Sequence, residues 1–287
     1  MGVCIVTDST VRFSPEFGKN ENLPITVVPL RIRFGDREYR DSVGLAEREI
    51  ASLAAQSGEM PQALPPTVDD FYRVYTGLNQ NCNEIISIHL PEKLSNTIQN
   101  ARRAANMLLG QCKIEIVDAE TTSLGLGILV ESAARAATEG QSIDQVIRYV
   151  RGIIPQIYIV FFSERLNDLK HADGIGEAQA LLGTMLGIKP LFTLESGEII
   201  PIEKVKTREA AIEKLIEFVV EFDAINQVAI IKSSSDSTEE TDYITQQLHE
   251  VFPDLNVPVM AYGPVLASYV GAKALGVVVH EDVSYDI

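Results

Sequence analysis

The alternation of short apolar runs with helical patterns in the first half of the chain most constrains the fold. The apolar runs cover residues 3–7, 25–34, 84–90 and 114–119. The helical patterns cover residues 46–58, 67–79, 94–110 and 124–140. Strands that alternate with helices are joined by right-handed crossovers in a parallel sheet. We therefore predict a mainly parallel, three-layer α/β domain.

The second half has a different order of elements. Strand patterns cover residues 156–162, 189–206, 226–234, 257–263 and 274–281, with helical patterns at 208–222 and 239–252. "LESGEI" is a hairpin-type turn with Gly197 at its tip. A hairpin joins antiparallel strands, so we expect a second α/β domain with an antiparallel or mixed sheet.

We place the boundary between the two domains near Pro155. A helix over residues 142–154 starts at Ser142, a good N-cap residue, and Pro155 closes it. The predicted domains are therefore residues 1–154 and 155–287.

Charge and hydropathy limit the partners of the chain. The net charge is −16, whereas nucleic acids and anionic membranes attract basic surfaces. No stretch of about 18 uncharged apolar residues and no leader-like terminus is present. We expect a cytoplasmic protein with no nucleic-acid partner and no integral membrane association.

Its three cysteines are widely spaced, and Cys4 and Cys112 border apolar runs, where a free thiol behaves as a small hydrophobe.

Metal and nucleotide motifs are missing from the sequence. The four histidines are far apart, and no HxxxH, CxxC or GxxxxGK[ST] pattern occurs. "GLGILV" lacks the full GxGxxG pattern, so Gly125 and Gly127 are interpreted as positions of close helix packing. We predict neither a metal nor a cofactor.

The stretch "VCIVTDST" ends an apolar run in a polar cluster, Asp8, Ser9 and Thr10. One hypothesis is a small phosphotransferase or phosphatase with Asp8 as nucleophile. Such sites commonly have a second acid two residues later, where this chain has Thr10, and no G-x-S-x-G elbow is present. The other hypothesis is that Asp8 and Ser9 accept hydrogen bonds from loop amides.

Hydroxyls stand where two of the predicted helices begin. Ser95 lies beside Asn96 and Thr97, and Thr207 precedes Arg208. A helix N-terminus favours anions, and a guanidinium can hold a carboxylate or phosphate. The alternatives are an ordinary N-cap for Ser95 and a solvated side chain for Arg208.

Seven motifs in order along the chain resemble the DegV family of bacterial fatty-acid-binding proteins. They are "VTDST", "PLRIRFGDREYRD", "LSNTIQNARRAA", "IEIVDAETTSLGLGILV", "LKHADGIGEAQALLGTMLGIKPLF", "GEIIPIEKVKTREAAI" and "GPVLASYVGAKALG". The resemblance implies two α/β domains with a long acyl chain in a tunnel at their junction. It also implies a non-enzymatic subunit that presents the carboxylate to a separate fatty-acid kinase, which makes acyl phosphate for phospholipid synthesis.

The same resemblance implies four hydrogen-bond donors to the fatty-acid head group. The serine of the "LSxT" motif is Ser95, and the arginine after "KVxT" is Arg208. Ala63 stands where the family has a loop threonine, with Thr67 four residues later. Tyr269 stands where the family has histidine. Asn96, beside Ser95, is a further candidate, and Asp8, Ser9 and Thr10 are expected to shape the head-group loop.

The wall of the acyl tunnel is harder to predict, because tunnel and core share one composition. "EAQALLGTMLGIKPLF" supplies Met185, Ile188 and Phe192 as candidates, with ordinary packing as the alternative. Two other classes compete with lipid binding: an enzyme that uses Asp8, and an interaction protein without a ligand.

Overall fold

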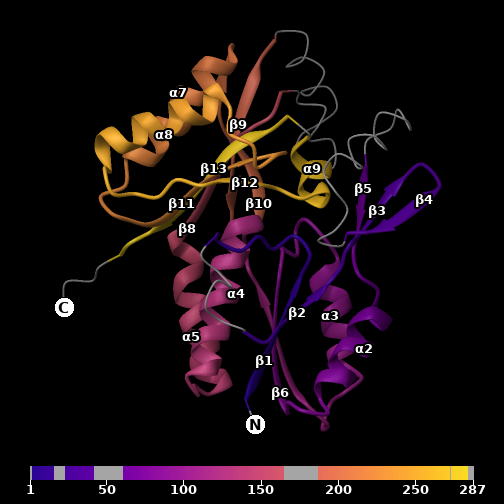
Figure 1. The fold of residues 1–287 in the computed structure, drawn as a ribbon. Coiled ribbons are helices and arrows are strands. Elements are labelled where there is room, and N and C mark those ends of the chain that lie inside the picture. The colour runs from indigo at the N-terminus through magenta and orange to yellow at the C-terminus, as the bar shows by residue number, and fades with distance from the viewer. Residues whose placement is uncertain (1, 16–22, 42–60, 165–186, 272, 284–287) are drawn as a thin grey trace. The chain divides into compact units, whose positions relative to one another are not determined.

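The computed structural model describes residues 2–15, 23–41, 61–164, 187–271 and 273–283. The chain divides into two compact units, Met1–Pro155 and Gln156–Ile287. Each unit contains its own strands and its own helices (Figure 1). We describe them separately.

Unit 1 is built on a four-stranded parallel sheet in the order β2-β1-β6-β7. Its strands are β1 (Val3–Asp8), β2 (Ile25–Val28), β6 (Glu84–His89) and β7 (Lys113–Asp118). Its helices are α2 (Val68–Leu78), α3 (Thr97–Asn106), α4 (Ser123–Thr138) and α5 (Ile143–Ile153). The predicted parallel α/β domain is confirmed.

The helices of unit 1 form the outer layers. The pair α2 and α3 covers one face of the sheet, and the pair α4 and α5 covers the other (Figure 1). Both strands and helices supply the core on the α2 side, where Val6, Ile85, Phe71, Tyr75 and Ala101 are buried together. Because β1 and β6 are covered on both sides, they consist almost entirely of buried residues.

Local sequence signals fix where two of these helices begin. Thr67 and Asp70 form a capping box at α2, and Ser142 and Gln145 form one at α5. The predicted N-cap at Ser142 is confirmed.

A small antiparallel sheet in the order β4-β3-β5 also belongs to unit 1. Its strands are β3 (Arg31–Phe34), β4 (Arg37–Arg40) and β5 (Gln62–Leu64). The prediction of one continuous strand over residues 25–34 is wrong: the chain leaves the parallel sheet after Val28 and enters the small one at Arg31. Pro29 lies at this break, and proline cannot donate to a sheet ladder. The helix predicted over residues 46–58 lies outside the described residues.

Two of the three cysteines are joined in unit 1. Cys4 and Cys82 form a disulfide with Cα atoms 6.2 Å apart, and Cys112 is free. The prediction of a free thiol is therefore wrong for Cys4 and correct for Cys112. Parallel pairing of β1 with β6 places Cys4 opposite Ile85, close to the loop that carries Cys82. The spacing of the cysteines along the sequence does not show this proximity.

Unit 2 is built on a six-stranded mixed sheet in the order β10-β9-β8-β13-β11-β12. Its strands are β8 (Ile157–Phe162), β9 (Lys189–Glu195), β10 (Glu198–Val205), β11 (Ile225–Lys232), β12 (Val259–Ala261) and β13 (Leu275–Glu281). Its helices are α7 (Arg208–Val220), α8 (Glu239–Val251) and α9 (Pro264–Val270). Among the described strands of unit 2, only β11 and β12 pair in parallel, so the predicted mixed sheet is confirmed.

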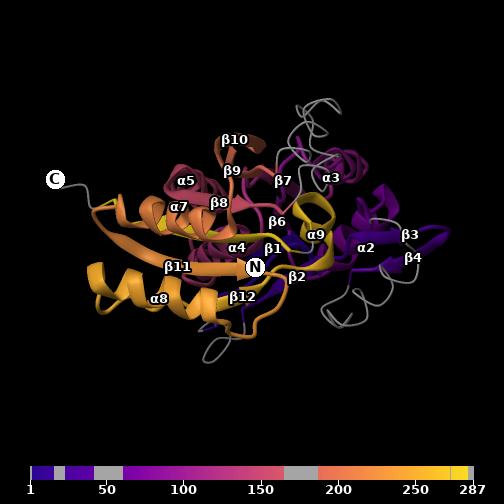
Figure 2. The ribbon, with the colours of Figure 1, turned by 90° about the horizontal axis from the view of Figure 1, so that it is seen from above.

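The core of unit 2 lies between this sheet and the helices α7 and α8. Val160, Phe162 and Ile230 from the strands pack with Leu215 and Leu248 from the helices. Figure 2 shows α9 on the side of the carboxyl end of β11, away from α7 and α8.

The predicted hairpin joins β9 to β10. Its two-residue loop is Ser196 and Gly197, with φ of 48° and 77°. Two central residues with positive φ are the mark of a type I′ turn, which matches the twist of the flanking strands.

Among the helices that the structure describes, none combines the length and the hydrophobicity that crossing a membrane requires.

Candidate functional site

Three parallel strands of unit 1 end in polar residues at one edge of the sheet. Asp8 ends β1, His89 ends β6 and Asp118 ends β7. The chain goes from β1 to β2 on one side and places β6 on the other, so the strand order reverses between β1 and β6. Ligands of open α/β sheets bind outside such a switch point, at the carboxyl ends of the strands. Asp8 and His89 lie there.

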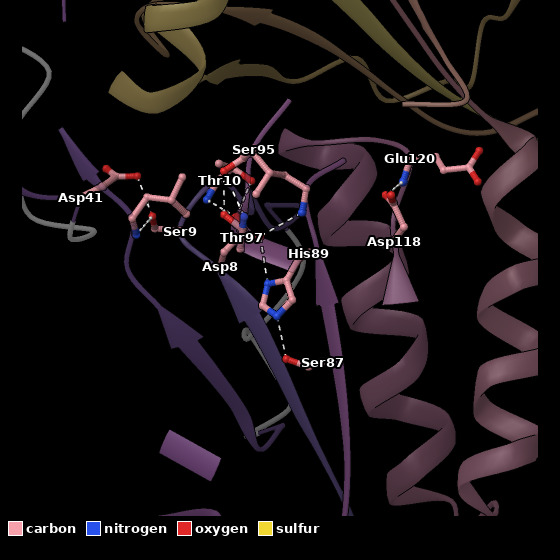
Figure 3. A network of polar contacts seen from close by, with 12 residues as sticks. Asp8, Ser9, Thr10, Asp41, Ser87, His89, Ser95, Thr97, Asp118 and Glu120 are labelled. Atoms are coloured by element: carbon pink, nitrogen blue, oxygen red, sulfur yellow. Dashed lines mark hydrogen bonds and ion pairs between the residues drawn. The ribbon is translucent and has the colours of Figure 1, made fainter. Parts of the chain in front are cut away.

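Asp8 is a buried carboxylate with both oxygens in use. Its Oδ1 accepts from the backbone N–H of Thr10 at 3.0 Å and from the Thr10 hydroxyl at 2.6 Å. Its Oδ2 accepts from the backbone N–H of Leu90 at 2.9 Å and lies 3.1 Å from Nδ1 of His89. The side chains of Asp8 and His89 are fully buried. The carboxylate therefore ties the end of β1 to the end of β6 (Figure 3).

A chain of hydrogen bonds continues from His89 into the core. Nε2 of His89 lies 2.6 Å from the Ser87 hydroxyl, which accepts from the Tyr75 hydroxyl at 2.9 Å. Since Tyr75 donates to Ser87, Ser87 donates to Nε2, and Nδ1–H of His89 donates to Asp8. Burial raises the pKa of Tyr75, so the phenol remains a donor at neutral pH.

This geometry does not favour Asp8 as a nucleophile. The order Ser87–His89–Asp8 resembles a hydrolase triad, but all three side chains are buried at 0% exposure. Four donors already occupy the Asp8 carboxylate. The structure agrees with the other hypothesis, in which Asp8 and Ser9 accept hydrogen bonds from loop amides.

Ser9 connects the same loop to the small sheet. Its hydroxyl donates to Oδ2 of Asp41 at 2.7 Å and accepts from the backbone N–H of Leu30 at 3.0 Å (Figure 3). Asp41 is buried, and burial raises the pKa of its carboxyl to about 6, against the hydrogen bond from Ser9 and the charge of Arg12. Asp8, Ser9 and Thr10 thus form one ordered turn.

Ser95 lies in the loop after β6, just before α3, and is half-buried. Its hydroxyl lies 2.8 Å from the Thr97 hydroxyl and accepts weakly from the Thr97 backbone N–H at 3.3 Å. Where Thr97 donates its hydroxyl proton, the O–H of Ser95 remains available to a ligand. Asn96 occupies the N-cap position, is exposed, and makes no side-chain cap bond.

Thr67 and Ala63 lie in unit 1 on separate elements. Thr67 donates its hydroxyl to Asp70 at 2.7 Å and accepts from the Asp70 backbone N–H at 3.1 Å, so it acts as the cap of α2. Ala63 is half-buried in β5, where it pairs with Ile32. Their roles at a head group stay predictions.

Arg208 is the first residue of α7 in unit 2 and is held by two carboxylates. It forms a bidentate pair with Glu240, at 2.5 and 2.9 Å, and its Nη1 donates to Glu164 at 2.6 Å. Its guanidinium also lies 5.0 Å from the centre of the Phe162 ring. The bonds to Glu240, and then to Glu164, outweigh partial burial and raise the pKa of Arg208. The solvated arginine considered above is therefore not observed.

The remaining predicted residues of unit 2 are largely buried. Tyr269 is buried in α9. Phe192 is fully buried in β9 and stacks on Phe161 with ring centres 5.6 Å apart. Ile188 is half-buried just before β9, and Met185 lies outside the described residues. The assignment of Met185, Ile188 and Phe192 to an acyl tunnel stays a prediction.

Sequence reasoning missed His89, Ser87 and Tyr75. Ser87 and His89 are two residues apart in a strand that is otherwise apolar, "IISIH", so they lie on one face of it. Polar residues at this spacing in a buried strand were the available signal.

Within the described ranges, no group of three or more His, Cys, Asp and Glu side chains is arranged to hold a metal ion.

Comparison with known proteins extends these findings. The profile described as "Uncharacterised protein, DegV family" matches residues 2–282. A DegV domain-containing protein of Deinococcus radiodurans is 33% identical over 219 residues, which are 76% of each chain.

Solved structures share the fold. A fatty-acid-binding DegV family protein from Thermus thermophilus is 27% identical, with a TM-score of 0.83 over 98% of this chain and 100% of that one. The Fatty Acid Kinase (Fak) B3 protein of Streptococcus pneumoniae, loaded with linoleic acid, is 18% identical, with a TM-score of 0.82 over 98% and 100%. The likeness to the Fak B3 protein shows only that the two chains share a fold. Because the family profile matches almost the whole length of this chain, the chain belongs to the DegV family.

Proposed function

We propose that this chain binds a long-chain fatty acid in a buried apolar site and presents the carboxylate to a separate kinase protein. The observation that carries the proposal is membership of the DegV family, together with a 27% identical relative from Thermus thermophilus that binds fatty acid. The kinase step rests on the family resemblance and on the fold shared with the Fak B3 protein.

Physical chemistry supports binding of this ligand class. A sixteen-carbon chain has about fourteen methylenes, and burial of each stabilises the complex by roughly 0.8 kcal/mol, or about 11 kcal/mol in all. Immobilising the ligand offsets a good part of this. A buried carboxylate also needs donors, because an unpaired buried charge is very costly.

Two predicted donors have suitable chemistry. Ser95 can keep one hydroxyl proton for a ligand, as described above. Within the described part of the chain, the hydrogen bonds of Arg208 use Nε–H, both hydrogens of Nη1 and one of Nη2, which leaves one N–H of its guanidinium. In this proposal Ser95 and Arg208 share the carboxylate, with Tyr269 as a third donor.

The alternative of a phosphotransferase that uses Asp8 has no comparable support. Its carboxylate is fully buried and accepts from four donors. Of the four donor positions that the family resemblance implies, Ala63 has no side-chain donor and Tyr269 offers a phenol in place of a histidine, so we expect a head-group geometry different from that of the family. The proposed ligand remains a fatty acid, held by a smaller set of donors.

The test is the content of the protein purified from bacteria. Native mass spectrometry is expected to show one bound long-chain fatty acid per chain, released by organic extraction. Empty protein that also fails to take up hexadecanoate would contradict the proposal. Incubation of the loaded protein with a bacterial fatty-acid kinase and labelled ATP should move label into acyl phosphate.

Variants test the head-group assignment. Ser95→Ala and Arg208→Ala should each weaken hexadecanoate binding by roughly 1–3 kcal/mol, the cost of a lost buried hydrogen bond. Ser132→Ala, at a half-buried serine of α4, serves as the control and should bind as the wild type does. Unchanged affinity in both head-group variants would refute the assignment.

A further inference from the structure

All three cysteines of the chain lie at one edge of the parallel sheet of unit 1. Cys4 is in β1, Cys82 comes just before β6, and Cys112 comes just before β7. Parallel strands begin at the same edge of a sheet, and here that edge is opposite the one with Asp8 and His89. Because the strand order is β2-β1-β6-β7, the segment with Cys82 lies between the segments with the other two cysteines.

The three cysteines also share one hydrophobic cluster. Cys4 is buried in the core that α2 and α3 cover, and Cys82 and Cys112 are half-buried against the same core. Backbone hydrogen bonds fix both half-buried residues where a helix gives way to a strand. The N–H of Cys82 donates to the Leu78 carbonyl at 2.9 Å, and the N–H of Cys112 donates to the Leu108 carbonyl at 3.3 Å.

Cys82 has a cysteine on each side. It is bonded to Cys4, and on its other side Sγ of Cys112 lies 3.9 Å from the Cys82 carbonyl oxygen. The N–H of Lys113 donates to the Asn83 carbonyl at 2.9 Å, so the ladder of β6 and β7 reaches these residues. Strands about 4.8 Å apart with a rise of about 3.3 Å per residue put the Cα atoms of Cys82 and Cys112 about 6 Å apart. Disulfides span Cα separations of about 4.4–6.8 Å.

We propose that these three residues form a thiol–disulfide exchange site, in which Cys82 bonds either to Cys4 or to Cys112. In the exchange the Cys112 thiolate attacks Sγ of Cys82, a new S–S bond forms, and the bond from Cys82 to Cys4 breaks. The electron pair of that bond goes to Sγ of Cys4, which takes up the proton that Cys112 has lost. One disulfide and one thiol are present before and after, so the step needs no oxidant and no reductant.

The two disulfides hold different strands together. The bond from Cys4 to Cys82 joins β1 to the start of β6 across 78 residues, whereas a bond from Cys82 to Cys112 joins the starts of β6 and β7 across 30. Exchange therefore removes the covalent link between β1 and β6, whose carboxyl ends meet through Asp8 and His89. Since a shorter loop constrains the unfolded chain less, the exchanged form should unfold at a lower temperature.

The environment of Cys112 slows the exchange at neutral pH. Burial, and then the charge of Glu84, raise the pKa of its thiol. The neighbouring ammonium of Lys113 is paired with Asp144 at 2.9 Å. Only the thiolate attacks a disulfide, so the exchange rate should rise about tenfold per pH unit below the pKa of Cys112.

The experiment maps the disulfide of the purified wild type, kept free of oxygen and of added thiols at pH 7, 8 and 9. Acid quenching, alkylation and peptide mass spectrometry identify the bonded pair. We expect the peptide that links Cys82 to Cys112 to appear, faster at higher pH and at a rate independent of protein concentration. Cys112→Ser should keep the original bond throughout. A wild type that retains only the bond from Cys4 to Cys82 at every pH, or a rate that rises with protein concentration, would overturn the inference.

Single substitutions test the shared role of Cys82 apart from the rate. Each variant is reduced and then oxidised with glutathione disulfide. Cys4→Ser, or Cys4→Ala if the serine variant does not fold, should bridge Cys82 to Cys112. Cys82→Ser is the matched control: it retains two cysteines but should form no internal disulfide, because β6 lies between β1 and β7. A control that bridges Cys4 to Cys112, or a Cys4 variant that leaves Cys82 and Cys112 unbridged, contradicts the proposal.

Discussion

At the scale of single residues, Asp8 is a structural centre of the site. Its carboxylate accepts four hydrogen bonds that join the ends of β1 and β6. Buried charged groups are tolerated where hydrogen bonds satisfy them, and the loss of one partner leaves the others unpaired. The turn that contains Asp8, Ser9 and Thr10 therefore depends on this one side chain.

Asp8→Asn should lower the free energy of unfolding by about 3 kcal/mol or more, because an amide cannot accept from all four donors. Asp118→Asn is the control. Asp118 ends the neighbouring strand and accepts from the backbone N–H groups of Glu92 and Glu120, but it is only half-buried (Figure 3). Urea denaturation measures both variants. Equal, small losses would contradict the role given to Asp8.

Asp41 makes stability depend on pH. Its folded pKa is about 6, above its usual 3.8, because of burial. A raised pKa contributes stability that is fully present below about 3.8 and is lost as the pH rises through about 6. Asp41→Asn should therefore be more stable than the wild type at pH 8, by up to about 3 kcal/mol, with the difference reduced to roughly 0.5 kcal/mol near pH 4. Denaturation across this range, with the exposed Asp254→Asn as control, checks it. A constant difference at all pH values would contradict it.

At the scale of elements, α4 depends on a close contact with the first loop. A Cβ built on Gly127 would lie 1.9 Å from the carbonyl oxygen of Arg12. The backbone of this loop also bonds to α4, from the Arg12 N–H to the Ser123 carbonyl at 3.0 Å. The interpretation of Gly127 as a packing glycine agrees with this contact.

Gly127→Ala should therefore destabilise the protein by about 1–3 kcal/mol, the usual cost of overpacking. Gly152→Ala is the matched control, since nothing lies within 4 Å of its Cβ position in α5. Helix propensity predicts that this second change stabilises by roughly 0.5–1 kcal/mol. Thermal or urea denaturation should give opposite signs. A neutral Gly127→Ala would show that the loop is not packed as described.

The elements were predictable where local signals were strong. Alternation of strands and helices predicted the parallel sheet, and Ser142 and Gly197 marked a cap and a turn. The division of residues 25–34 into β2 and β3 was not predicted, because periodicity does not show which sheet a strand joins; Pro29 was the available signal.

At the scale of the whole molecule, the parts of a site become visible only through tertiary contacts. Ser95 and Arg208 were predicted only through the family resemblance, since nothing local separates a ligand-binding serine from an N-cap. The Asp8–His89 pair was not predicted at all, because 81 residues separate the two along the chain and only parallel pairing brings them together.

In the proposed function, the chain holds a fatty acid by its carboxylate. The most direct measurement is the electron density of the protein crystallised after loading with hexadecanoate. We predict one elongated ligand whose carboxylate lies about 2.5–3.2 Å from the Ser95 hydroxyl and from a nitrogen of Arg208. A ligand whose carboxylate contacts neither residue, or a crystal that takes up no hexadecanoate, would contradict the account.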